Sequence, residues 1–226
     1  MKNIKIVLVF IVSALILNSC SYEAGLKIRC SIKSENGTSV TAEIIPENNV
    51  GCIANGAVVY VTDCFNQITM ASYNNSMGVY KAVELNPLSD FFYVSVISAA
   101  LSKPYEIKIP HNVISVKPEI VAMTDSLNNN VFSGNELDVN EEIQIGWEKC
   151  DGKVVYDVKI QTQLLTVWTG STSVNYISVP SKNLEEGKSY TVSVCAQRII
   201  GDPLFLNCDY SSVSTFNSTK VNFYTK

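Results

Sequence analysis

Few side chains in this chain of 226 residues could do chemistry, and His111 is its only histidine. Nucleophilic catalysis needs a serine or cysteine activated by a neighbouring base, so one imidazole permits at most one such site. Because His111 follows Pro110 in a stretch expected to join two domains, we interpret it as a solvated linker residue. The sequence has no G-x-S-x-G elbow, P-loop or G-x-G-x-x-G turn. We therefore predict a protein that is not an enzyme and uses no cofactor or metal.

Acidic residues leave two further hypotheses open. Glycoside hydrolysis needs two carboxylates about 5–10 Å apart, and 141–142 and 185–186 are pairs of adjacent glutamates. Neighbours on a strand point to opposite faces, so we interpret both pairs as solvated and rank an enzyme last. Weak calcium binding is the other hypothesis, although no D-x-[DN]-x-[DN]-G string is present. The aspartates concerned lie in expected loops: Asp125, Asp138, Asp151, Asp202 and Asp209.

Another reactive group is the thiol of Cys20, which follows an apolar segment at the start of the chain. Lys2 and Lys5 precede an apolar run at 6–17, which is the layout of a secretory signal peptide. The run is shorter than the ~20 apolar residues that a membrane-spanning helix needs. We therefore predict a signal peptide at 1–19 and a tether at 20–25.

The end of this segment resembles the cleavage motif of bacterial lipoproteins, in Leu17, Ser19 and Cys20. The resemblance implies that Cys20 carries diacylglycerol on its sulfur and becomes the first residue of the mature chain. One acyl chain binds membranes weakly, whereas two or three hold stably. Ser21 stands where an aspartate would imply retention at the inner membrane, so the resemblance implies the outer membrane and leaves its face open.

The overall charge is acidic, with 17 Lys and Arg against 21 Asp and Glu and a pI near 5.1. No basic field is available for a nucleic-acid backbone, which argues against that class of partner. Six further cysteines permit either disulfides, with no preferred pairing, or buried free thiols. They are Cys30, Cys52, Cys64, Cys150, Cys195 and Cys208.

Short alternating segments between Asn, Gly, Ser and Pro residues predict an all-β chain with two consecutive immunoglobulin-like sandwiches. The first domain is expected at 26–112, a linker at 113–118 and the second domain at 119–226; length alone also permits one large β domain. Expected strands of the first domain are 26–32, 40–45, 57–62, 67–73, 79–85, 92–98 and 105–109. Those of the second are 119–123, 142–147, 154–161, 164–168, 176–179, 189–197 and 219–224.

The second domain resembles a fibronectin type III domain. The resemblance rests on alternating apolar residues around Trp147 and Tyr156, and on Leu184, Gly187 and Tyr190 before another alternating run. We expect Trp147 and Tyr156 to fill the space between two sheets. The other three are expected to form a tyrosine corner, in which the hydroxyl bonds to upstream backbone.

The first domain resembles a prealbumin-like sandwich at 56–61, 78–80 and 93–96. Together with the lipidated cysteine, the two domains resemble bacteroidete lipoproteins of unknown function encoded near TonB-dependent transporters. The resemblance implies a cell-envelope lipoprotein held to the membrane through Cys20. Because catalytic motifs are missing, we expect a non-catalytic protein whose sandwich loops bind an envelope protein, such as a transporter, or a glycan. The alternative is an adhesin or pilus-like assembly component.

Two segments of the second domain are candidates for binding. Trp168 and Tyr176 would form a stacking surface if Trp168 is exposed, although Trp168 could instead cover the edge of its own sheet or the other domain. The loop at 199–206 is too apolar for an idle loop, and its Leu204 and Phe205 could bind a partner, cap the core or touch the first domain.

Overall fold

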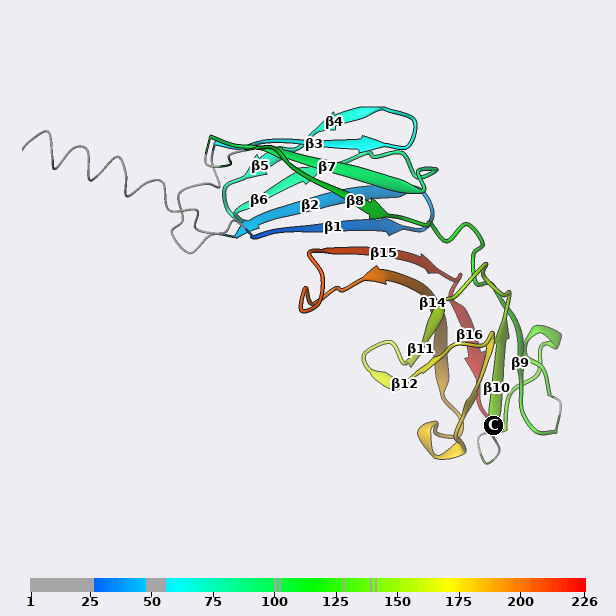
Figure 1. Cartoon of the computed structure of the whole chain (residues 1–226). Coiled ribbons are helices and arrows are strands. Elements are labelled where there is room, and N and C mark those ends of the chain that lie inside the picture. The colour runs from blue at the N-terminus through cyan, green and yellow to red at the C-terminus, as the bar shows by residue number, and fades with distance from the viewer. Residues whose placement is uncertain are drawn as a thin grey trace, which may run out of the picture.

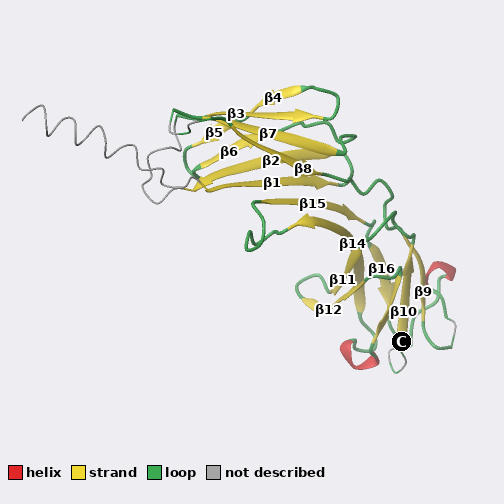
Figure 2. Ribbon diagram, viewed as in Figure 1, coloured by secondary structure: helices red, strands yellow, loops and turns green. Residues whose placement is uncertain are grey.

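The computed structural model describes residues 27–47, 56–99, 101, 103–127, 129–138, 140 and 142–226. The predicted signal peptide, Cys20 and Cys52 lie outside these residues. The described chain consists of β-strands in sandwich sheets, with two single-turn 3-10 helices, η1 (Val131–Ser133) and η2 (Ser181–Asn183) (Figure 2). The predicted all-β class is thereby confirmed. In the part described, no helix is long and apolar enough to cross a membrane.

The first sandwich stacks two sheets, ordered β5-β6-β2-β1 and β4-β3-β7-β8. Alternate residues of both sheets point inward around Ile32, Val61 and Phe92, each at most 1% exposed. The segment expected as one strand at 67–73 divides at buried Ala71, so that β4 joins one sheet and β5 the other. The strands are β1 (Lys27–Glu35), β2 (Ser39–Glu47), β3 (Val58–Asp63), β4 (Ile68–Met70), β5 (Ser72–Asn74), β6 (Val79–Ala82), β7 (Phe91–Ile97) and β8 (Tyr105–Pro110).

The second sandwich has the sheet arrangement of a fibronectin type III domain. One sheet is ordered β13-β10-β9, and the other contains β12-β11-β14 with β16 paired to β14. Trp147 is 1% exposed and lies 5.2 Å from Tyr156 between ring centroids, so both rings occupy the core. The strands are β9 (Ile120–Thr124), β10 (Ile143–Trp147), β11 (Val155–Gln161), β12 (Thr166–Thr172), β13 (Tyr176–Val179), β14 (Ser189–Gly201) and β16 (Val221–Tyr224).

A tyrosine corner is present at the start of β14. The backbone N–H of Glu185 donates to Tyr190 Oη at 2.8 Å, and Tyr190 is 3% exposed. Leu184 packs into the same core, and Gly187 has φ +69°, a conformation that side chains with a Cβ disfavour. The hydroxyl therefore fixes the turn that precedes β14.

One strand, β15 (Tyr210–Asn217), joins the two sandwiches. It pairs antiparallel with the second half of β14 and parallel with β1 of the first sandwich, from Cys30↔Tyr210 to Glu35↔Thr215. Figure 1 shows β15 lying beside β1 while β14 bends away into the second sandwich. The result is one nine-stranded sheet that runs through both domains.

Candidate functional site

The two aromatic residues predicted as a stacking surface are not brought together. Trp168 is partly buried on the core of the second sandwich, and it lies so close to Gly170 that a Cβ there would meet its ring at 2.6 Å. The residue of β13 on this side is Ile177, whereas Tyr176, which is 59% exposed, has the opposite orientation on the strand. Trp168 thus covers the edge of its own sheet.

Only part of the second predicted binding segment is a loop: residues 199–201 are the end of β14, paired with β15, and residues 202–206 lie in the loop between these strands. Its Asp202 carboxylate accepts hydrogen bonds from the N–H groups of Leu204, Leu206 and Asn207 at 2.8–2.9 Å, which fix the loop's shape. Leu204 is 71% exposed. Phe205 instead turns back, with its ring 5.5 Å from the guanidinium carbon of Arg29 in β1. In this loop, Phe205 contacts the first sandwich and Leu204 is at an exposed apolar tip.

The solvated position expected for His111 is wrong, because its side chain is 2% exposed. Its Nδ1 lies 2.7 Å from Ser212 Oγ of β15, and its ring packs 5.5 Å from Phe92. No polar atom of a described residue lies within hydrogen-bonding distance of Nε2. Burial without a charged partner lowers the pKa of His111 from 6.5 to about 4, so the imidazole is neutral at pH 7.

His111 belongs to a group of buried polar residues along β1 and β15, on both faces of the shared sheet, which we name the polar junction. Ile114 N–H donates to Ser214 Oγ at 2.8 Å, and Ser211 Oγ donates to Ser31 Oγ at 3.3 Å. Its members are 9% exposed or less: Ser31, Ser34, His111, Ser211, Ser212 and Ser214. Ser212 and Ser214 contact the segment that follows β8, through His111 and the N–H of Ile114, and the β1–β15 ladder joins β15 to the first sandwich.

The Arg198 side chain extends this junction from β14. It donates to Asn112 Oδ1 at 2.6 Å and to backbone oxygens of Asn112, Val113 and Asp151. A guanidinium can bind several oxygens in one plane, which suits a site where chain segments meet. Arg198 thus ties the stretch between the domains to the second sandwich.

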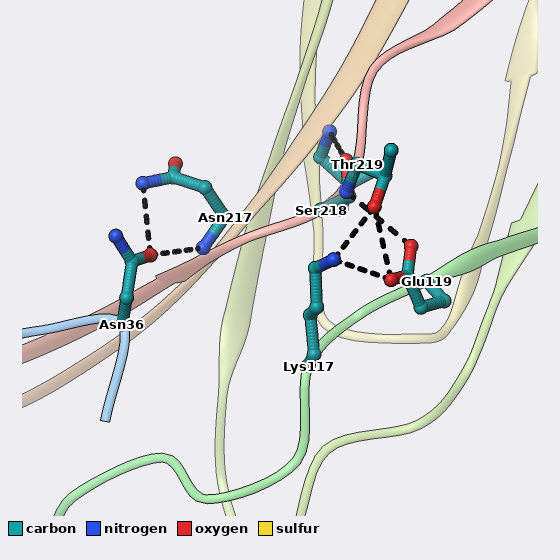
Figure 3. Close-up of polar contacts among 7 residues, drawn as sticks. Asn36, Lys117, Glu119, Asn217, Ser218 and Thr219 are labelled. Carbon is teal, nitrogen blue, oxygen red and sulfur yellow. Dashed lines mark hydrogen bonds and ion pairs between the residues drawn. The ribbon is translucent and has the colours of Figure 1, made fainter. Parts of the chain in front are cut away.

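A groove of about 440 Å³ lies beside the junction, at the ends of the strands opposite the start of β1. Figure 3 shows contacts near it: Asn217 donates through its backbone and side-chain nitrogens to Asn36 Oδ1, and Lys117 pairs with Glu119, which also accepts from Thr219. Of the polar residues that line the groove, Asn36, Ser89 and Asn112 are hydrogen-bonded within the protein through their side chains. Its lining includes Gly37, Pro87, Leu88, Asn112, Val113 and Phe216.

Two of the acidic candidates, Asp125 and Glu142, line one pocket of about 270 Å³ together with Thr124, Ser126 and Gln144. Glu142, Glu185 and Glu186 are exposed, and Glu141 lies outside the described residues. Asp125 is buried, and its carboxylate accepts from backbone N–H groups of Leu127, Asn129 and Asp138. Those hydrogen bonds lower its pKa although burial opposes them. Within the described ranges, no three His, Cys, Asp or Glu residues are grouped to hold a metal ion.

The five described cysteines are free thiols. Burial raises the pKa of Cys30 to about 12 and also raises the pKa of Cys150 and Cys195. Thiols with raised pKa values are poor nucleophiles at neutral pH, so these side chains act as small apolar residues.

The surface with an unusual composition is the outer side of the sheet formed by β4, β3, β7 and β8. Residues paired directly across strands point to one side, which places Met70 beside Tyr60, and Ile68 and Tyr93 on either side of Thr62. We name this surface the apolar face. Its exposed members are Val58 at 40%, Ile68 at 64%, Met70 at 67%, Tyr93 at 44% and Ile97 at 46%.

The apolar face has a shallow depression and a charged margin. The depression, of about 270 Å³, is lined by Tyr60, Thr62, Ile97 and Glu106 among others. At the margin, Lys108 Nζ lies 3.8 Å from the ring centroid of Phe91. In Figure 1, β3 and β4 lie on the side of the first sandwich away from the second. The sequence analysis did not predict the apolar face, because its apolar residues alternate with core residues as they do in any strand.

Comparison with known proteins identifies neither family nor function. No protein-family model and no curated protein matches the chain. Similar solved structures include a cytokine receptor complex, with 6% identity and TM-score 0.43 over 86% of this chain and 95% of that one. Chicken CNTN1 FN1-FN3 domains have 12% identity and TM-score 0.43 over 87% of this chain and 63% of that one. A biofilm-associated protein BSP domain has 12% identity and TM-score 0.29 over 88% of this chain and 30% of that one.

Proposed function

We propose that this chain is a non-catalytic cell-envelope lipoprotein, held at the outer membrane through acylated Cys20, that binds an envelope protein with its apolar face. The supporting observation is the exposure of Ile68, Met70, Tyr93 and their neighbours on one sheet surface. Contiguous exposed apolar surface of this kind marks interaction sites in soluble proteins. In this proposal the first domain is the prealbumin-like module and the second is its fibronectin type III-like support.

The frame behind the face suits a binding role. The apolar face is the outer side of a paired four-stranded sheet whose inner side, with Val61, Phe92 and Val94, packs in the core, so a partner would meet a preorganised surface and lose little by ordering it. An outer-membrane transporter is the partner class that the lipoprotein resemblance favours.

The anchor is tested by mass and fractionation of the full-length protein. We expect an intact mass that fits a chain beginning at acylated Cys20, and membrane association that Cys20→Ser abolishes. An unmodified N-terminus, or a Cys20→Ser protein that still sediments with membranes, would overturn the anchor.

The face is tested by photo-crosslinking in the living cell. We expect a photoreactive residue at Met70 to form one adduct of discrete mass, and the same residue at Lys159, on the outer surface of the second sandwich, to form none. A transporter in the adduct supports the proposal as stated. No adduct above the Lys159 control contradicts it.

An adhesin or pilus-like assembly component is the second candidate. It is favoured by β4, which pairs with β3 on one side and presents Ile68 and Met70 at the edge of its sheet. Open apolar edges are templates for association with another copy. An adduct at Met70 of twice the chain mass, with matching self-association in sedimentation velocity, would replace the transporter by a second copy.

A further inference from the structure

The end of the molecule at which β1 begins carries exposed apolar tips from both sandwiches. Leu204 and Leu206, 71% and 77% exposed, lie in the loop before β15. This loop is beside the first residues of β1, since Cys30 N–H donates to Asp209 O at 2.9 Å and Arg29 lies over Phe205. Two separate contacts therefore fix the loop next to the start of β1.

The turn between β5 and β6 reaches the same end. β2 pairs antiparallel with β1 so that Glu47 faces Lys27, and β2 pairs with β6 from Ile44↔Tyr80. The start of β6 is therefore at the β1 entrance, and the preceding turn carries Met77, which is 63% exposed. Figure 1 shows this turn and the β14–β15 loop on the side where β1 begins.

The length of chain before β1 limits how far this end can lie from an acyl anchor. Seven residues, 20–26, separate Cys20 from Lys27 inclusive of the cysteine. An extended chain spans at most about 3.6 Å per residue, so β1 starts within about 25 Å of the acylated sulfur. Any lipid surface that holds Cys20 is thus close to Leu204, Leu206 and Met77.

We infer that the β14–β15 loop and the β5–β6 turn form a membrane-contacting end, with Leu204, Leu206 and Met77 placed in the interfacial layer of the bilayer. This inference rests on the proposed acylation of Cys20. Of the two acidic residues of the loop, Asp202 and Asp209, the Asp202 carboxylate is already bonded by several N–H groups, which makes the approach of lipid less costly. The tether supplies a high effective concentration, so three side chains suffice to orient the protein.

The orientation leaves the proposed binding surface accessible. The apolar face lies on the outer side of the sheet of the first sandwich that does not contain β1, and its strands run from the entrance end to the opposite end. With the entrance end on the lipid, this face stands upright on the membrane. That orientation suits lateral contact with another protein embedded in the same bilayer.

Tryptophan substitution in the full, acylated protein tests the contact. L206W and M77W are reconstituted separately into phosphatidylcholine vesicles with and without dibrominated acyl chains, and the emission added to that of Trp147 and Trp168 is measured. We expect brominated lipid to quench the added emission several-fold more than in the matched control L164W. Leu164 is 90% exposed, but its turn lies at the other end of β14, because β11 pairs antiparallel with β14 up to Gln161↔Thr191.

The outcomes separate the inference from the proposed anchor. If the protein floats with the vesicles while L206W and M77W are quenched no more than L164W, the membrane-contacting end is wrong and the anchor stands. If the chain is unacylated and does not float, the anchor is wrong and the inference falls with it. Unchanged thermal unfolding of all three variants shows that the native fold is being compared.

Discussion

The polar junction and the apolar face reverse the usual distribution of side chains. The junction buries hydroxyls and an imidazole along β1 and β15, whereas the apolar face exposes Ile68, Met70 and Tyr93. Most folded chains bury the apolar groups and leave serines in water. We therefore interpret the polar junction as a contact within the chain, and the apolar face as a surface for contact with another molecule.

The difference shows how two domains can be fixed without a large hydrophobic interface. Along β15, backbone amide groups form hydrogen bonds with β1. A serine hydroxyl accepts a hydrogen bond from a further amide, as Ser214 Oγ does from Ile114 N–H. Buried polar groups cost little when they are bonded and a great deal when they are not. A shifted register would break the contacts of Ser212 with His111 and of Ser214 with Ile114 N–H, so these two bonds make the junction specific, whereas Ser34 Oγ and His111 Nε2 have no partner among the described residues.

The largest expected effect is at the centre of the junction. Ser212→Leu would overfill a site that is 2% exposed and remove the partner of His111 Nδ1. We expect a loss of about 4 kcal/mol in the free energy of unfolding, from overpacking and an unpaired imidazole together. Denaturant unfolding measures it, with exposed Ser173→Leu as the control. A loss no larger than that of the control would mean that the junction does not hold the domains.

Acid should weaken the same junction in a defined range. The pKa of His111 is lowered to about 4 in the folded protein from an ordinary value of 6.5, so the unfolded chain binds more protons between these values. Stability is then fully present above about pH 6.5 and falls by about 3 kcal/mol as the pH decreases to about 4. The lowered pKa of Asp125 acts at lower pH, through the loss of its hydrogen bonds.

The single histidine makes this measurement clean. Unfolding free energies of the parent and His111→Gln are compared from pH 7.5 to 4, and their difference isolates the imidazole. We expect the variant to have a flatter profile over this range. Parallel profiles would contradict burial of His111 between the domains.

Sequence patterns gave the strands of the two sandwiches but missed β15, the strand that joins them. Alternating apolar residues predict β10 and β11 well, because one side of each strand meets the core. In β15 the buried positions are Ser211, Ser212 and Ser214, so its pattern resembles a loop. Serine is common in loops, and only the opposing strand β1 makes a strand favourable here.

The same limit explains the errors about His111 and the binding surface. The position after Pro110 indicates a break in structure, and local sequence cannot show that β15 covers it. In the apolar face, the apolar residues Ile68 and Met70 alternate with polar Thr69. This pattern predicts that Ile68 and Met70 point to the core, but in the structure Thr69 is the less exposed residue and the two apolar side chains point outward. Which side of a short strand faces the core depends on its neighbours, and these are set by topology.

The smallest expected effect on stability concerns the apolar face itself. The double variant Ile68→Ser/Met70→Ser removes two side chains that are 64% and 67% exposed, so we expect its free energy of unfolding to change by less than about 0.5 kcal/mol. Val61→Ala, at a fully buried position of the adjacent strand β3, should cost about 2 kcal/mol. The double variant should nevertheless lose the Met70-region contact to the envelope partner, measured as co-purification of that partner from membranes. If the double variant folds normally but no longer associates with the partner, Ile68 and Met70 serve binding and not folding. A double variant as unstable as Val61→Ala would show instead that the face supports the fold.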